Sequence, residues 1–330
     1  MKDCRIHCSW VGLLVLSLAG GSVSAAESEG VKVQKIWDQG AHNAFTDLTR
    51  FKDRWYCVFR EGKGHVSPDG ALRVLQSDDA KTWRSAALIT SPTGDLRDAK
   101  ITITPEGKLM LVGASALHPP SPVRHQSLVW FSDDGENWSE PVEIGEPNFW
   151  IWRITWHKGK AYGIGYATTE PRMARLYQSD DGRKFDVLVE NLFDDGYPNE
   201  TGLVFLEDDS VLCLLRRDPG EAMLGKAVPP YTEWKWQGLG KRVGGPELLQ
   251  LPDGRLLAAG RDYIGSATTR LWWLDPAKPE LEEIVTLPSG GDTSYPGLVW
   301  DNGRLWVSYY SSHEGKTNIY VAEVQLPEKQ

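Results

Sequence analysis

The stretch Ser132-Asp133-Asp134-Gly135-Glu136-Asn137-Trp138 has two near copies in the chain. One copy runs from Ser77 to Trp83, and the other runs from Ser179 to Phe185. The starts are 55 and 47 residues apart, and periods of this size indicate a repeat architecture. Each copy follows an apolar, strand-like run and has the Ser, Asp and Gly content of a hairpin turn. The copies therefore predict turns that fasten neighbouring strands in successive repeats.

A second pattern continues the repeat along the chain. Two apolar runs separated by a polar turn occur six times, and the turns are marked by Asp53, Gly107, Gly159, Asp209, Gly254 and Gly303. Six units of about 50 residues predict an all-β fold, a six-bladed β-propeller with four strands per blade. The sixth unit keeps only one further strand, Asn318–Val324. We expect Val31–Trp37 to supply the missing strand and to close the ring by joining the two ends of the chain.

The first 25 residues predict a cleavable signal peptide. Basic Lys2 and Arg5 precede an apolar run, Val11–Ala19, which is too short to span a bilayer, and small residues follow up to Ala25. The expected mature protein is a single propeller domain, residues 26–330, that is secreted or periplasmic and has no membrane association after cleavage. We expect it to be a monomer.

Composition narrows the classes of function and of site. The formal net charge is −9, and an acidic chain without a basic run argues against nucleic-acid binding. Cys57 and Cys213 follow the signal peptide and occupy matching positions in blades three apart. They should lie on opposite sides of the ring axis, too far apart for a disulfide. No Cys/His spacing indicates zinc, and the sequence predicts no metal and no cofactor.

Three arginines recur at one structural position. Seven residues after the turn markers, the chain carries Arg60, Ala114, Tyr166, Arg216, Arg261 and Tyr310. In a propeller these positions reach the rim opposite the turns, about one strand length away. Converging guanidinium groups favour a carboxylate or sulfate ligand because arginine offers a bidentate donor pair and keeps its charge.

The three quoted stretches resemble the Asp-box of sialidases and related β-propellers, although each is one residue shorter than the usual motif. Ala80 replaces its Gly in the first copy, and Phe185 replaces its Trp in the third. As a fold, the resemblance covers the whole mature chain. It also implies site residues: Glu200 with Arg216 and Arg261 are similar to a glutamate and two arginines of the sialidase site. The strand Thr293–Trp300 looks like the one that carries the nucleophilic tyrosine, here Tyr295.

The resemblance assigns further roles. Arg60 resembles the blade 1 arginine, Asp69 the loop aspartate used as general acid and base, and Asp98 a substrate-contacting aspartate. A neutral phenol nucleophile avoids repelling an anionic sugar, and it needs a base, here Glu200. Tyr295, Glu200 and Asp69 are thus the expected catalytic residues. The expected substrate-binding residues are Arg60, Arg216, Arg261, Asp98, Arg153 and Tyr310.

One position departs from the family pattern. Ala44 stands where sialidases have the first arginine of their triad, so Arg153, Arg217 or His42 would have to replace it. The sequence predicts an exo-acting glycosidase for an acidic glycan with a terminal sialic-acid-like sugar. Two alternatives stay open. One is a glycosidase or lyase acting on uronic-acid-containing glycans, and the other is a non-catalytic glycan-binding propeller.

Overall fold

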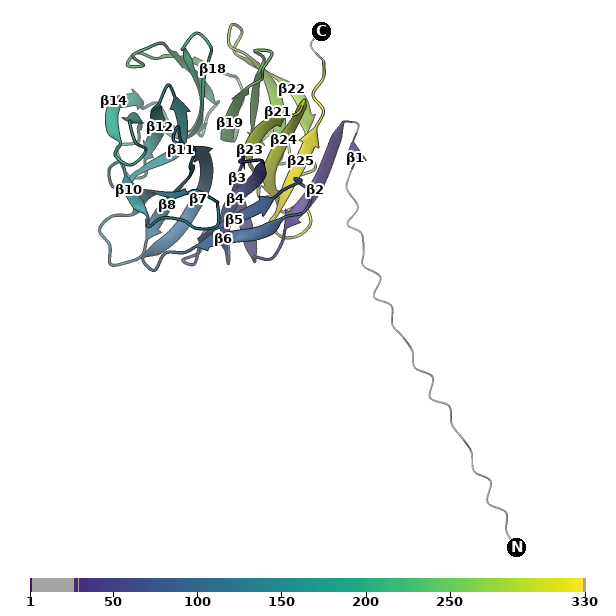
Figure 1. The fold of residues 1–330 in the computed structure, drawn as a ribbon. Coiled ribbons are helices and arrows are strands. Elements are labelled where there is room, and N and C mark those ends of the chain that lie inside the picture. The colour runs from purple at the N-terminus through teal and green to yellow at the C-terminus, as the bar shows by residue number, and fades with distance from the viewer. Residues whose placement is uncertain (2–26, 29, 329–330) are drawn as a thin grey trace.

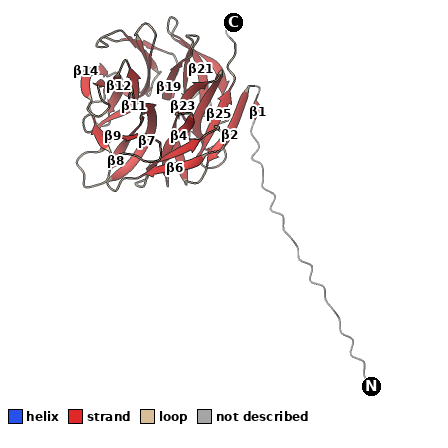
Figure 2. Cartoon of the chain, viewed as in Figure 1, coloured by secondary structure: helices blue, strands red, loops and turns tan. Residues whose placement is uncertain are grey.

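The computed structural model describes residues 1, 27–28 and 30–328, so the predicted signal peptide lies almost entirely outside the described residues. Figure 1 shows the chain wound into a ring of sheets around a central axis. In Figure 2 the described elements are all strands. Within the described residues, no helix is long and apolar enough to cross a membrane. The six sheets confirm the predicted all-β, six-bladed propeller.

Each blade is an antiparallel sheet. Blade 1 comprises β3 (His42–Phe51), β4 (Arg54–Gly62), β5 (Ala71–Ser77) and β6 (Arg84–Ile89). Blade 2 comprises β7 (Gly94–Ile103), β8 (Leu109–Leu117), β9 (His125–Ser132) and β10 (Val142–Ile144). Blade 3 comprises β11 (Phe149–His157), β12 (Lys160–Ala167), β13 (Ala174–Ser179) and β14 (Asp186–Phe193). Blade 4 comprises β15 (Tyr197–Phe205), β16 (Val211–Asp218), β17 (Met223–Ala227) and β18 (Lys235–Gly238). Blade 5 comprises β19 (Val243–Gln250), β20 (Leu256–Asp262), β21 (Thr268–Asp275) and β22 (Glu280–Thr286).

Blade 6 joins the two ends of the chain. It contains β23 (Thr293–Asp301), β24 (Arg304–Ser311) and β25 (Asn318–Val324), and its outer strands are β2 (Val31–Trp37) and the short β1 (Glu27–Ser28). β2 pairs antiparallel with β25 from Val31–Val324 to Trp37–Ile319. The prediction that Val31–Trp37 closes the ring is confirmed.

Apolar side chains fill the spaces between neighbouring blades. Cys57 is fully buried in a cluster that includes Trp152 and Tyr295, whereas Cys213 is fully buried in a different cluster around Leu203. Both cysteines are unbonded, as predicted. Each thiol therefore contributes packing between blades.

The three repeated turns share one hydrogen-bond pattern. In blade 2, Asp134 Oδ1 accepts the backbone N–H groups of Glu136 and Asn137, both at 2.8 Å, and Ser132 Oγ accepts the N–H of Gly135. Trp138 Nε1 donates to the carbonyl of Gly135, whose φ of 77° suits glycine. The blade 3 copy repeats both the Ser and the Asp contacts, and the blade 1 copy repeats the Asp contacts. These local bonds explain why the motif recurs where the third and fourth strands of blades 1 to 3 are joined.

Blade 4 keeps part of this turn without its polar residues. Trp234 Nε1 donates to the carbonyl of Tyr231, three residues earlier, at 2.9 Å, as Trp138 does to Gly135. Tyr231 also takes a positive φ, 66°, as Ala80, Gly135 and Gly182 do in the other copies. The hydrogen bond from the indole N–H to the carbonyl three residues earlier is therefore kept in blade 4, although the Ser and Asp residues of the motif are not.

Trp138→Ala should lower stability and leave the chemistry unchanged. The ring of Trp138 is half-buried against the cluster around Tyr56 and Trp130, so its loss should fall below that of a fully buried aromatic residue, at about 2–3 kcal/mol. Chemical denaturation measures this loss. The control is Asp133→Ala, which removes an exposed ion pair with Lys108 worth about 0–1 kcal/mol. If Trp138→Ala is as stable to chemical denaturation as the control, the Trp138 ring does not stabilise the turn.

A shared backbone irregularity shapes the rim opposite these turns. Every innermost strand has a register shift at the same level, between Ala44/Asp47, Arg97/Lys100, Ile151/Ile154, Pro198/Thr201, Gly244/Glu247 and Ser294/Gly297. Bulges of this kind re-aim side chains. Phe45, Asp98, Gly245 and Tyr295 all have positive φ there, between 51° and 64°. The ring of bulges therefore gives the innermost strands an irregular backbone at one level near the axis.

Candidate functional site

Tyr295 and Glu200 meet at the centre of this rim. The Tyr295 hydroxyl donates a hydrogen bond to Glu200 Oε1 at 2.5 Å, across two blades. Arg216 Nη1 donates both to Glu200 Oε2, at 2.8 Å, and to the Tyr295 hydroxyl oxygen, at 3.1 Å. Tyr295 and Glu200 are both buried. The structure thus brings together the two residues predicted to act as nucleophile and base.

The environment of Tyr295 keeps its phenol protonated. Burial, and then the charge of Glu200, raises the pKa of Tyr295 well above its usual value, against the opposing effect of Arg216 and Arg261. Its backbone is also constrained, with φ of 51° at Tyr295 and 98° at Ser294. Such conformations are uncommon outside glycine and concentrate at functional sites. A phenol of this kind reacts only if its proton has somewhere to go, and Glu200 lies within reach.

A glycine makes room for the pair. The backbone N–H of Gly245 donates to Glu200 Oε2 at 2.7 Å. A Cβ at Gly245 would lie 2.8 Å from the ring of Tyr295, and its φ is 56°. Blade 5 therefore contributes a backbone donor where the other blades contribute side chains.

The two arginines near Tyr295 already have carboxylate partners. Arg216 contacts Glu200 and also Asp218, with 2.9 Å between Nη2 and Oδ2. Arg261 stacks over the Tyr295 ring at 5.4 Å and lies 3.4 Å from Asp292. Both guanidinium groups lie beside Tyr295, as predicted. Nearby carboxylates nevertheless offset much of their positive charge.

Arg60 does not join them. Its side chain is fully buried and donates to Asp95 Oδ1 at 2.7 and 2.9 Å, to the carbonyls of Gly64 and Ser67, and to the Ser67 hydroxyl. A guanidinium with its donors in use and no exposed surface does not fit the predicted substrate contact. Arg60 instead fixes the loop 63–70, which connects β4 to β5.

Arg153 lies beneath the site rather than on the rim. It is paired with Asp47, at 2.9 Å, and with Glu247, and its Nη2 donates to the carbonyl of Pro296 at 2.6 Å. Buried Lys100 completes a layer of two cations and two carboxylates. These four residues line a cavity of about 490 Å³ on the lower side. Arg153 therefore supports the strand of Tyr295 and does not replace the arginine missing at Ala44.

The two predicted aspartates differ in their surroundings. Asp69 is exposed on loop 63–70; burial alone would raise its pKa, but hydrogen bonds from Ser67 and the Lys63 N–H together outweigh burial and lower that pKa. Asp98 is buried on the blade 2 bulge, and burial raises its pKa despite Arg97 and Lys100. A proton donor near neutral pH needs a raised pKa, so Asp98 has the environment that Asp69 lacks.

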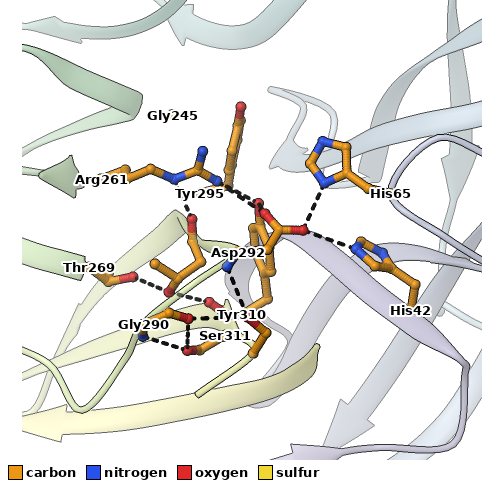
Figure 3. A network of polar contacts seen from close by, with 12 residues as sticks. His42, His65, Gly245, Arg261, Thr269, Gly290, Asp292, Tyr295, Tyr310 and Ser311 are labelled. Atoms are coloured by element: carbon orange, nitrogen blue, oxygen red, sulfur yellow. Dashed lines mark hydrogen bonds and ion pairs between the residues drawn. The ribbon is translucent and has the colours of Figure 1, made fainter. Parts of the chain in front are cut away.

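Tyr310 belongs to a network at the edge of the site (Figure 3). Its hydroxyl accepts from Arg261 at 2.8 Å and donates to Asp292 Oδ1 at 2.9 Å. The other oxygen of Asp292 contacts His42 and His65. From the sequence, His42 is expected only as a possible substitute for the missing arginine, and neither Asp292 nor His65 is predicted. Asp292 lies three residues before Tyr295 in the sequence, and this nearness to the expected nucleophile was the signal that could have identified Asp292.

Comparisons with known proteins identify the fold. No protein-family model and no curated protein matches the sequence. A crystal structure of a protein of unknown function from Dyadobacter fermentans matches with a TM-score of 0.79 and 21% identity, covering 91% of this chain and all of that one. A Trypanosoma rangeli sialidase matches with a TM-score of 0.70 and 10% identity. The match covers 90% of this chain and 59% of the sialidase. An α-L-arabinofuranosidase from Fusarium graminearum matches with a TM-score of 0.69 and 13% identity, covering 89% of this chain and 97% of that one. At these identities the likeness establishes that the chain has the sialidase-like six-bladed β-propeller fold.

Proposed function

We propose that this protein is an exported glycoside hydrolase in which Tyr295 is the nucleophile and Glu200 its base. The observation that carries the proposal is the buried contact of 2.5 Å between the Tyr295 hydroxyl and Glu200 Oε1, with Arg216 donating to both residues. An aromatic core residue requires neither a carboxylate partner from another blade nor a positive φ. The fold neighbours named as a sialidase and an arabinofuranosidase support a glycosidase.

The proposed reaction uses these groups in two steps. The Tyr295 oxygen attacks the anomeric carbon while its proton passes to Glu200, and the bond from that carbon to the leaving oxygen breaks as a carboxylic acid protonates the oxygen. Water then displaces the tyrosine, Glu200 returns the proton to the phenol oxygen, and the conjugate carboxylate takes a proton from the water. Two displacements retain the configuration of the sugar. Arg216 stabilises the phenolate character that develops at Tyr295.

For the substrate, we propose a terminal anionic sugar whose carboxylate is held by Arg216 and Arg261. Arginine suits this role because its planar donors match a carboxylate. A second candidate is a neutral sugar such as an arabinofuranoside. It is favoured by the pairing of both arginines with Glu200, Asp218 and Asp292, which offsets the positive charge that an anionic sugar needs.

A release assay over matched acidic and neutral glycosides decides between the candidates. The panel contains sialosides, uronides and arabinofuranosides with the same chromogenic leaving group, together with a uronic-acid polymer read for new unsaturated product. Release from sialosides alone supports the anionic sugar, and release from arabinofuranosides alone supports the neutral one. An unsaturated product would show lyase chemistry. Binding without turnover of any substrate would refute the hydrolase and leave a glycan-binding propeller.

The identity of the proton donor can be tested with the same assay. If Asp98 is the acid, Asp98→Asn should slow release of a poor leaving group by about 10²–10⁴-fold, because general acid catalysis contributes about this much, and it should affect an activated leaving group less. Asp69→Asn should then have little effect on either substrate. The opposite pattern would restore Asp69 to the role expected from the sequence.

A further inference from the structure

We propose that His42, His65 and Asp292 form a binding site for a divalent transition-metal ion of the zinc class. His42 Nε2 lies 3.0 Å and His65 Nδ1 lies 2.7 Å from the same carboxylate oxygen, Asp292 Oδ2. The three possible ligand atoms all lie within 4.8 Å of one another. Two imidazole nitrogens and one carboxylate oxygen are a donor set that zinc uses where a coordination position is left open for water or substrate.

The carboxylate is held in place from its other side. Asp292 Oδ1 accepts a hydrogen bond from the Tyr310 hydroxyl at 2.9 Å and lies 3.4 Å from Arg261, so Oδ2 is left to face the two histidines (Figure 3). Metal-binding carboxylates and histidines typically depend on outer partners of this kind, which fix the ligand orientation. Tyr310 and Arg261 therefore act as positioning residues for the proposed site.

The loop that carries His65 is also fixed before any ion arrives. Buried Arg60 donates to the Gly64 and Ser67 carbonyls of this loop and also to Asp95, so it holds the loop against β7. His42 begins β3, and Asp292 directly precedes β23. The three ligands thus come from three separate segments that are each anchored independently. A site organised in this way loses little conformational freedom on binding an ion.

Exposure and charge both suit an ion that reaches a substrate. The His65 side chain keeps 49% of its surface exposed, which gives access from solvent, whereas that of His42 keeps 12%. Phe45 contacts His65 and Tyr295, with ring centroids 5.1 Å apart in each pair, so the site borders the catalytic pair. A divalent ion here would supply positive charge two residues from Ala44, where the sialidase pattern has an arginine. Its open positions would take oxygens of the sugar.

Zinc binding to the protein alone tests the proposal. Chelator-treated protein is titrated with ZnCl₂ by calorimetry, with bound zinc measured after dialysis and with CaCl₂ as the comparison ion. We expect one zinc per chain, little affinity for calcium because imidazole is a poor calcium ligand, and an affinity about tenfold lower in Tyr310→Phe. His65→Ala should abolish saturable binding, and its half-exposed side chain makes this the variant least at risk of misfolding.

His157→Ala is the matched control. His157 lies 3.1 Å from Asp209 at the opposite end of blade 3, in a His–Asp pair without a second histidine. The His157→Ala protein should bind zinc like the unmodified protein. Absence of saturable zinc binding, or unchanged binding in His65→Ala, would overturn the proposal, and so would binding that is lost in His157→Ala instead. Because no substrate is involved, failure of this site and failure of the proposed hydrolase are seen in separate experiments.

Discussion

Tyr295→Phe should lower kcat on the order of a thousandfold, and Glu200→Gln should lower it by a similar factor. In the proposed mechanism the Tyr295 proton passes to Glu200 across the contact of 2.5 Å, so removing either residue disables the same step. Combined, the two substitutions should lower kcat about as much as either does alone, because groups that act as one unit are strongly non-additive. A double-mutant cycle on the best substrate of the release panel measures this coupling.

The control for this cycle is Tyr309→Phe. Tyr309 is the buried neighbour of Tyr310 on β24, and its hydroxyl donates to the carbonyl of Pro288 at 3.0 Å, away from the catalytic pair. It removes the same single oxygen and should leave kcat unchanged. If the losses from Tyr295→Phe and Glu200→Gln simply add, or if Tyr295→Phe changes KM alone, Tyr295 is a wall of the binding site and not its nucleophile.

Arg153→Met should destabilise the protein by about 3–5 kcal/mol. The substitution leaves buried Asp47 and Glu247, whose side chain keeps 16% of its surface exposed, with only Lys100 to balance them. An uncompensated buried charge carries a penalty of this size. It also removes the donor to the Pro296 carbonyl, which supports the strand of Tyr295. Chemical denaturation gives the loss, and kcat of the folded fraction reports the displacement of Tyr295.

Two further variants show whether charge is the cause. Arg304→Met removes an exposed arginine that lies 3.6 Å from Glu323, and it should change stability by no more than about 1 kcal/mol. Adding Glu247→Gln to Arg153→Met should recover part of the loss because it removes one of the two stranded carboxylates. If the double variant is less stable than Arg153→Met, packing and not charge explains the effect.

The ring could be predicted from the sequence because its signals are local. A turn such as Ser132–Trp138 satisfies its own hydrogen bonds within seven residues, so the same letters mark the turn in blades 1 to 3. The pairing of β2 with β25 could be predicted because one strand was missing from the count. The meeting of Tyr295 and Glu200 followed from the resemblance to sialidases, together with the equal spacing of rim positions from each turn.

The fate of each arginine could not be predicted in this way. Arg60, Arg216 and Arg261 have the same spacing from their turns, but Arg60 and Arg261 each pair with an inner-strand residue, whereas Arg216 lies opposite the bulge of its blade. The direction of each side chain also depends on which carboxylate lies nearby. Asp95 binds the Arg60 side chain beneath loop 63–70. Glu200 binds Arg216 and Asp292 binds Arg261, and both of these arginines lie near Tyr295. These partners come from other strands, and their distances depend on the register shifts of the inner strands. A pattern of spacings along the chain does not contain that information.

Closure of the ring by β2 and β25 also constrains the order of events during synthesis. β2 ends at Trp37 and its partner β25 begins at Asn318, so the ribosome must add roughly 280 residues before β2 can pair. Until then, β2 has an open edge that can pair with another copy. Blades 1 to 5 contain only consecutive strands and can form as they emerge, but blade 6 cannot. Nascent chains stalled before residue 318 should therefore carry folded blades in an unsealed ring that a protease opens from the amino-terminal side.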